Sequence, residues 1–183
     1  MNQLQMLADE VAVNERTLRR AANEGTIRVE RPSARRLRIS LAEKNYLRRR
    51  WQLLAALRAA LRTEPNVSFA LLFGSAARGD DGTRSDVDLI VQFRDSSLTR
   101  VLELEERLER AIERKVDVVS LEAAERNSGL LASAVGEGRV LVDRAGLWPA
   151  LSAETAALER RARREDRRQT REAFAGIDRL LNR

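Results

Sequence analysis

Two aspartates lie two residues apart at the start of an apolar segment, ten residues after a Gly-Ser pair. The segment reads Asp86-Val87-Asp88-Leu89-Ile90-Val91, and its alternation predicts a strand over residues 86–93. Because side chains of a strand alternate between its faces, we expect both carboxylates on one face and Val87 in the core. Adjacent carboxylates repel each other unless a cation lies between them, and such oxygen ligands suit magnesium or manganese. The pair therefore predicts a divalent-metal site, although either aspartate alone could be a solubilising charge at a strand edge.

Gly74 and Ser75 follow a nearly continuous apolar run over residues 67–73, which predicts a buried strand. Glycine lets a backbone approach a ligand closely, and free N–H groups at the start of a following helix can hold phosphate oxygens. A phosphate cradle beside a metal site is the equipment of phosphoryl or nucleotidyl transfer by two metal ions. A Gly-Ser pair alone is more often an ordinary turn, so this interpretation depends on the aspartates that follow.

Asp117 interrupts a later apolar segment, residues 116–121, which predicts another strand. A lone buried aspartate is costly without a partner, so we expect Asp117 on a neighbouring strand of the same sheet, facing Asp86 and Asp88. There it would bind one metal ion and take the proton from an attacking hydroxyl. The alternative is a surface position at the end of a strand.

The combination of Gly74-Ser75, ten residues and Asp86-Val87-Asp88 resembles the signature of the nucleotidyltransferase superfamily that includes DNA polymerase beta. The Gly-Ser-x-x-Arg-Gly and Ser-Asp-x-Asp-Leu forms are similar to those of its small bacterial members, the minimal nucleotidyltransferases. The resemblance covers about residues 67–144. It implies that Gly74 and Ser75 hold the triphosphate of an NTP and that Asp86, Asp88 and Asp117 bind Mg²⁺ or Mn²⁺. Nucleotide binding is also expected of Arg78 and Ser85; Arg78 would supply the charge that many relatives carry directly after Gly-Ser, where this chain has Ala76.

The same resemblance implies a partner protein. Small relatives of this kind often accompany toxins, which implies an antitoxin that adds AMP to its toxin. Other relatives modify aminoglycosides or tRNA ends, and the sequence leaves these acceptors open. The competing hypothesis is a catalytically silent transcription regulator or antitoxin that uses the nucleotidyltransferase fold as a nucleotide sensor or scaffold.

The excess positive charge lies entirely in the first 50 residues, which hold 12 basic and 6 acidic residues within a chain of net charge +6. This imbalance predicts a nucleic-acid-binding segment. Two helices over residues 4–11 and 14–24 and two short strands near 27–30 and 38–39 resemble the winged helix-turn-helix class. Three arginines of the second helix would face a DNA major groove: Arg16, Arg19 and Arg20. Five arginines of the wing would contact backbone phosphates: Arg28, Arg31, Arg35, Arg36 and Arg38. The alternative is a protein-interaction domain with a solvated basic face.

Cysteine and histidine are absent, which excludes disulfides, zinc–thiolate sites, thiol nucleophiles and histidine bases. No apolar run approaches the ~20 residues of a membrane span, and no signal-peptide pattern opens the chain. We therefore expect no membrane contact and a cytoplasmic location.

We expect an α/β protein with a small mixed sheet of the nucleotidyltransferase type and flanking helices, preceded by a winged helix-turn-helix and followed by a C-terminal helix. Ser40 and Glu43 form a capping box that opens the connecting helix, whose apolar stripe Arg58 interrupts. Helix-turn-helix proteins often bind palindromes as dimers, so we expect a homodimer. The expected divisions are a winged helix-turn-helix at 1–40, a connecting helix at 41–64, the nucleotidyltransferase domain at 65–145 and a helical segment at 146–183.

Overall fold

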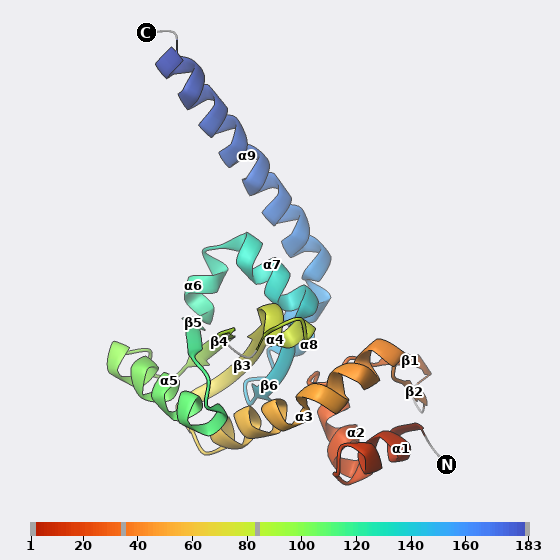
Figure 1. Cartoon of the computed structure of the whole chain (residues 1–183). Helices are drawn as coiled ribbons and strands as arrows, with labels where there is room; N and C mark the ends of the chain where they lie inside the picture. The colour runs from red at the N-terminus through yellow and green to blue at the C-terminus, as the bar shows by residue number, and fades with distance from the viewer. Residues whose placement is uncertain (1–2, 34–35, 83–84, 182–183) are drawn as a thin grey trace.

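The computed structural model describes residues 3–33, 36–82 and 85–181. Figure 1 shows a central sheet, the N-terminal elements on one side of it, and a long C-terminal helix that points away from the body. The elements in chain order are α1 (Gln3–Glu10), α2 (Glu15–Asn23), β1 (Glu30–Ser33), β2 (Arg36–Arg38), α3 (Leu41–Arg62), β3 (Val67–Phe73), α4 (Gly74–Arg78), β4 (Val87–Phe93), α5 (Leu98–Ile112), β5 (Val116–Ser120), α6 (Leu121–Glu125), α7 (Ser128–Glu137), β6 (Arg139–Asp143), α8 (Trp148–Ala153) and α9 (Thr155–Leu181).

The central sheet has four strands in the order β5-β4-β3-β6. Strand β3 pairs antiparallel with β4 and β6, while β4 and β5 are parallel. This arrangement confirms the expected small mixed sheet. Asp88 of β4 lies opposite Phe73 at the end of β3 and opposite Asp117 on β5. The register therefore brings the end of β3 and two predicted acids to one edge of the sheet.

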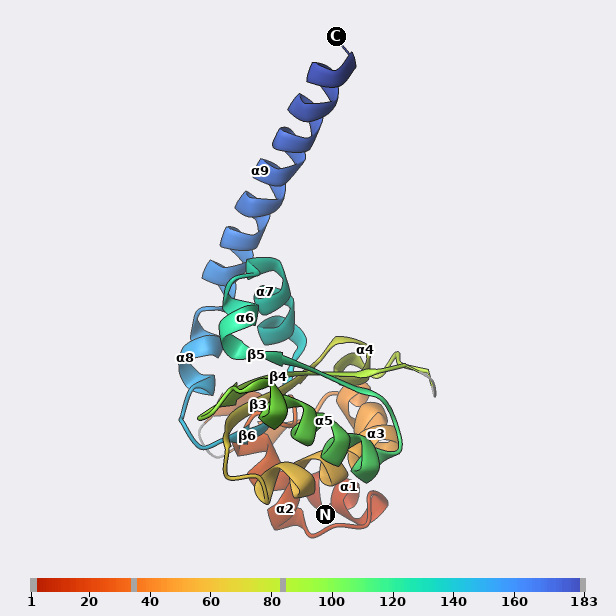
Figure 2. The same ribbon diagram turned by 90° about the vertical axis from the view of Figure 1, so that its left-hand side faces the viewer.

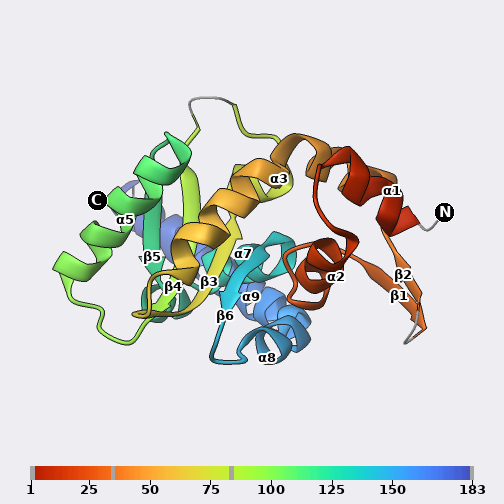
Figure 3. The same ribbon diagram turned by 90° about the horizontal axis from the view of Figure 1, so that it is seen from below.

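Each face of the sheet is covered by helices, as Figures 2 and 3 show. One face packs on α3 and α5 through a cluster that includes Leu54, Leu89 and Leu108. The other face packs on α6 and α7 through a cluster that includes Ile90 and Leu131. Because side chains alternate along a strand, Asp86, Asp88 and Ile90 share the face toward α6 and α7.

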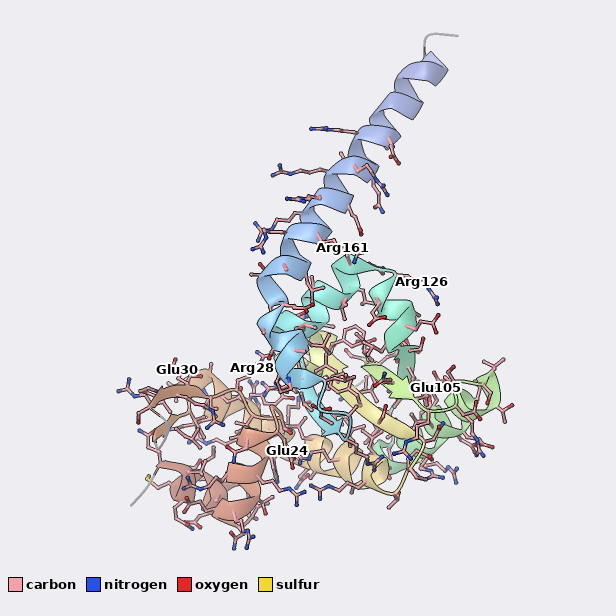
Figure 4. All side chains as sticks on the ribbon, turned by 180° about the vertical axis from the view of Figure 1, so that it is seen from behind. Glu24, Arg28, Glu30, Glu105, Arg126 and Arg161 are labelled. Carbon is pink, nitrogen blue, oxygen red and sulfur yellow. The ribbon has the colours of Figure 1, made fainter. Side chains whose placement is uncertain are left out.

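The N-terminal segment packs directly on the sheet. Its buried residues belong to the same cluster as the α3 and α5 side of the sheet. The backbone N–H of Val140 donates to Gly25 O at 3.2 Å, and Thr26 Oγ1 donates back to Val140 O at 2.6 Å. Arg58, which interrupts the apolar stripe of α3, is buried here and binds Glu24 and Thr26. Figure 4 shows Glu24 and Arg28 where the N-terminal segment meets the body.

Two of the predicted helix ends are confirmed in detail. Asn14 Oδ1 accepts from the backbone N–H of Arg16 at 2.8 Å, and Gly25 adopts φ +83° directly after the end of α2. At α3, Ser40 Oγ accepts from the N–H of Glu43 at 3.1 Å. The capping box is nevertheless only half formed, because the Glu43 carboxylate turns away to bind Arg139 and the N–H of Arg28.

The short hairpin begins later than the expected residues 27–30. Ile27 is buried and the N–H of Arg28 binds Glu43 at 3.1 Å, so this stretch anchors the chain to the core instead of pairing as a strand. The sequence reading also missed α6, which begins where Ser120 Oγ accepts from the N–H of Ala123 at 3.2 Å.

Helix α9 leaves the body after contacting α7 and α8 near its start. The side chains of residues 162–172 extend on both sides of the helix (Figure 4). Within the described ranges, no helix is both long and apolar enough to cross a membrane.

Candidate active site

Gly74 lies against the Asp88 side chain in the candidate site. Gly74 begins α4 directly after β3 and adopts φ +68°, a left-handed backbone conformation that favours glycine. A Cβ at this position would lie 2.5 Å from Asp88 Oδ2, so any other residue would force the Asp88 carboxylate to shift. Glycine is therefore favoured here by the backbone conformation and leaves the Asp88 carboxylate in place.

The three predicted acids lie on one face and at one edge of the sheet. Asp88 and Asp117 are register neighbours across the parallel strands β4 and β5, and Asp86 stands one residue before β4. Val87 between them is fully buried, as expected. The structure thus brings all three carboxylate-bearing residues to the side of the sheet where α4 begins.

The carboxylates of Asp86, Asp88 and Asp117 repel one another. Burial raises the pKa of Asp88, the neighbouring Asp117 and Asp86 raise it further, and Arg78 opposes the shift. No hydrogen bond or ion pair involves these three carboxylates within the part of the chain that the structure describes. A half-buried, unpartnered carboxylate beside two others is the arrangement that a hard divalent cation relieves.

The oxygen-only donor set fits magnesium or manganese. Among the described residues, however, no three acidic side chains converge closely enough to hold a metal ion by themselves. Further oxygen ligands, such as those of a triphosphate, would have to complete the coordination.

Asp117 is not buried, contrary to the expectation from the apolar segment around it. The residue lies on the strand next to β4, as expected, but it is exposed rather than buried. The physical reason is the strand order, because β5 is an edge strand of the sheet. A cost of burial therefore does not explain the acid at this position.

The other predicted nucleotide-binding residues lie around α4 and the loop that follows. Ser75 is half-buried in the first turn of α4, and its carbonyl accepts from the N–H of Gly79 at 2.8 Å. The Arg78 guanidinium pairs with Asp80 at 3.1 Å and with Glu137 at 2.8 Å. Ser85 Oγ accepts from the N–H of Gly82 at 3.0 Å within the loop.

Sequence reasoning missed a buried carboxylate in this loop. The Asp81 side chain is fully buried and pairs with Arg50 of α3 at 2.7 Å and with Arg114 at 2.8 Å. Arg114 also donates to the carbonyl of Ser85 at 2.6 Å, directly before Asp86. This clamp fixes the loop that carries the first acid. In the sequence, Asp81 is only an aspartate among loop glycines, and this pattern does not identify Arg50 and Arg114 as its partners.

The predicted DNA-binding arginines have different surroundings. Arg19 pairs with Glu15 on its own helix, and Arg20 pairs with Glu24, which directly follows that helix. Arg28 turns inward to the carbonyl of Glu137, and Arg31 donates to Asn23 at 2.9 Å. Arg16 and Arg38 are exposed, whereas Arg35 and the side chain of Arg36 lie outside the described residues.

Residues 56–146 match the family described as polymerase beta, nucleotidyltransferase. A search of the curated proteins finds no match.

Similar solved structures cover most of the chain. A chain from a toxin–antitoxin crystal structure with AMP-PNP shares 22% identity over 67% of this chain and 96% of its own length, with a TM-score of 0.51. A mutant of the toxin–antitoxin MntA–HpeT shares 21% identity over the same fractions, with a TM-score of 0.51. A complex of tri-AMPylated Shewanella oneidensis HEPN toxin with MNT antitoxin shares 20% identity over 70% and 98%, with a TM-score of 0.48. Residues 56–146 of this protein are thus similar to the polymerase beta nucleotidyltransferase family, and the small mixed sheet is consistent with that fold.

Proposed function

We propose that this protein is a metal-dependent nucleotidyltransferase that moves an NMP from an NTP to an acceptor hydroxyl and releases pyrophosphate. The observation that carries the proposal is the contact between Gly74 and Asp88, with Asp117 in register beside Asp88. This arrangement places the Gly-Ser turn beside Asp88 and Asp117. These two acids and Asp86 repel one another in the absence of a cation.

In the proposed mechanism, Gly74 and Ser75 orient the triphosphate against the sheet edge, with Arg78 and Ser85 at its border. Asp86, Asp88 and Asp117 would hold Mg²⁺ or Mn²⁺, which supplies charge stabilisation at the phosphate oxygens. Asp117 accepts the proton of the acceptor hydroxyl. The hydroxyl oxygen bonds to the α-phosphorus, the bond to the bridging oxygen breaks, and pyrophosphate leaves with that electron pair.

The acceptor that we favour is a hydroxyl on a partner toxin, with ATP as the donor. Two structures of similar fold come from toxin–antitoxin complexes, and one of them was determined with AMP-PNP.

Calorimetric titration of ATP, GTP, CTP and UTP with Mg²⁺ tests the donor site. The wild type should bind one NTP only when the metal is present, and Asp88→Ala should abolish binding. Asp166→Asn is the matched control, because Asp166 is exposed on α9 away from the sheet. Equal NTP binding by wild type and Asp88→Ala would overturn the proposed site.

A second candidate activity, DNA binding, is favoured by a basic groove between α2 and α3. Four arginines and no acidic side chain line it, together with Asn14, Thr17, Trp51 and Ala55; the arginines are Arg16, Arg20, Arg58 and Arg62. Such a groove suits a phosphate backbone. A silent regulator would lose function on Arg19→Ala with Arg20→Ala and tolerate Asp86→Ala, whereas the enzyme would show the opposite pattern.

A further inference from the structure

Side chains from outside α4 hold two of its carbonyl groups. The Tyr46 hydroxyl of α3 donates to Ala76 O at 3.0 Å, and Arg139 Nε donates to Ala77 O at 2.7 Å. The last four carbonyls of any helix lack partners within it, and Ala76 and Ala77 are both buried. Without Tyr46 and Arg139, these carbonyls would be unsatisfied inside the protein, which is costly.

Tyr46 also contacts the end of α4. A Cβ on Gly79, which has φ +87°, would lie 2.7 Å from the Tyr46 ring. The ring and the hydroxyl of one residue therefore touch Ala76 and Gly79 together. Because α4 has only five residues, it has little stability of its own, and its position depends on such contacts.

Arg139 is in turn fixed by Glu43. Its guanidinium binds the Glu43 carboxylate through two bonds of 2.6 and 2.9 Å and lies 3.5 Å from the centroid of the Tyr46 ring. Both members of the ion pair are almost fully buried, at 1% and 4% exposure. Removing either charge would leave the other unpaired in the interior. Glu43 also accepts from the N–H of Arg28, which links the pair to the N-terminal segment.

Glu43 and Tyr46 precede residues 56–146, the part of the chain that matches the nucleotidyltransferase family. We propose that Tyr46 and Arg139 are positioning residues for the Gly74–Arg78 turn, with Glu43 fixing Arg139, so that α3 and the N-terminal segment complete the nucleotide site. This inference rests on the proposed function of that turn. It follows from the contact at Gly74, where any shift of α4 changes the approach to Asp88. Displacements of about 1 Å in a site can change rates by roughly a hundredfold.

Tyr46→Phe tests the proposal, because it keeps the ring over Arg139 and removes only the hydroxyl. We expect the Kd for ATP with Mg²⁺ to rise roughly fivefold, the effect of one lost hydrogen bond. The matched control is Ser68→Ala, which also removes a hydroxyl that donates to a backbone carbonyl, that of Gln92 at 3.0 Å, far from α4 at the other end of β3. It should leave the Kd unchanged. Equal Kd values for Tyr46→Phe and wild type would overturn the proposal.

Hydrogen exchange in the nucleotide-free protein gives an independent readout. The N–H of Gly79, bonded to Ser75 O, should exchange faster in Tyr46→Phe than in wild type or Ser68→Ala. Unchanged exchange would show that Tyr46 does not position the turn. If wild type binds no NTP but exchange accelerates, the positioning role holds and the proposed function fails.

Arg139→Lys provides the second variant. It retains the positive charge opposite Glu43 but cannot bind Glu43 through two bonds and Ala77 O at the same time. We expect a folded protein with a raised Kd for ATP and faster Gly79 exchange. A folded Arg139→Lys protein with wild-type values in both measurements would contradict the proposal.

Discussion

The α-carbon of Gly74 faces the carboxylate of Asp88 so closely that a β-carbon would come within 2.5 Å of Oδ2. Gly74 is the first residue after β3, and Asp88 lies on the neighbouring strand β4. The two halves of the sequence motif are therefore adjacent in the structure, and a side chain at position 74 would displace the Asp88 carboxylate.

Gly74→Ala should therefore damage both stability and the site. The substitution forces an alanine into a left-handed conformation and against Asp88, and we expect a loss of about 2 kcal/mol in the free energy of unfolding. NTP binding should be lost as well. Urea denaturation and calorimetry measure the two effects. Gly136→Ala is the control, because a Cβ there meets nothing within 4 Å and α7 should become more stable by about 0.5–1 kcal/mol.

Asp88→Asn should stabilise the metal-free protein at neutral pH while removing NTP binding. The pKa of Asp88 is raised in the folded state, first by burial and then by Asp117 and Asp86, with Arg78 opposing. The folded state therefore binds this proton more tightly than the unfolded state does. Consequently the free energy of unfolding falls as pH rises above 3.8 through the folded pKa, and the loss persists at neutral pH.

Urea denaturation of wild type and Asp88→Asn across pH checks this sign. The variant should be the more stable protein at pH 7, and the difference should shrink as pH falls toward 3.8. Only wild type should gain stability on addition of Mg²⁺ with NTP, because ligand binding stabilises the folded state. A variant that is less stable than wild type at pH 7 would show that Asp88 is favourably paired.

The elements that position the site were predictable because their signals are local. Buried runs and alternation predicted β3 and β4, and the face of Asp88 follows from the two-residue period of a strand. The exposure of Asp117 was not predictable in this way, because it depends on the order of strands that are distant in sequence. The capping function expected of Glu43 failed for a similar reason, since its partner Arg139 lies 96 residues away.

Asp81 should be much more important for stability than its neighbour Asp80. The Asp81 carboxylate is buried between Arg50 and Arg114, so Asp81→Ala leaves two part-buried arginines without their shared partner. We expect a loss of about 3 kcal/mol in the free energy of unfolding. Asp80 is exposed and pairs with exposed Arg78, so Asp80→Ala should cost less than about 1 kcal/mol. Similar losses for both variants in urea denaturation would contradict the clamp.

The basic groove makes a prediction about salt. Burial lowers the pKa of the Arg58 guanidinium, and the nearby Arg62 and Arg20 lower it further while Glu24 opposes them. A phosphate strand in the groove would add counter-charge beside these arginines, of which Arg20 and Arg58 already pair with Glu24. If the protein binds DNA there, Arg16→Gln and Arg62→Gln should each weaken binding and reduce the slope of log K against log salt concentration by about one.

Fluorescence anisotropy with duplex DNA at several salt concentrations measures that slope. Arg126→Gln is the control, because Arg126 directly follows α6, away from Glu24 and the groove (Figure 4), and pairs with Glu122 at 2.7 Å. An unchanged slope for Arg126→Gln and a reduced slope for the groove variants would assign the contacts to α2 and α3. Equal slopes for all variants would mean that DNA, if bound, contacts another surface.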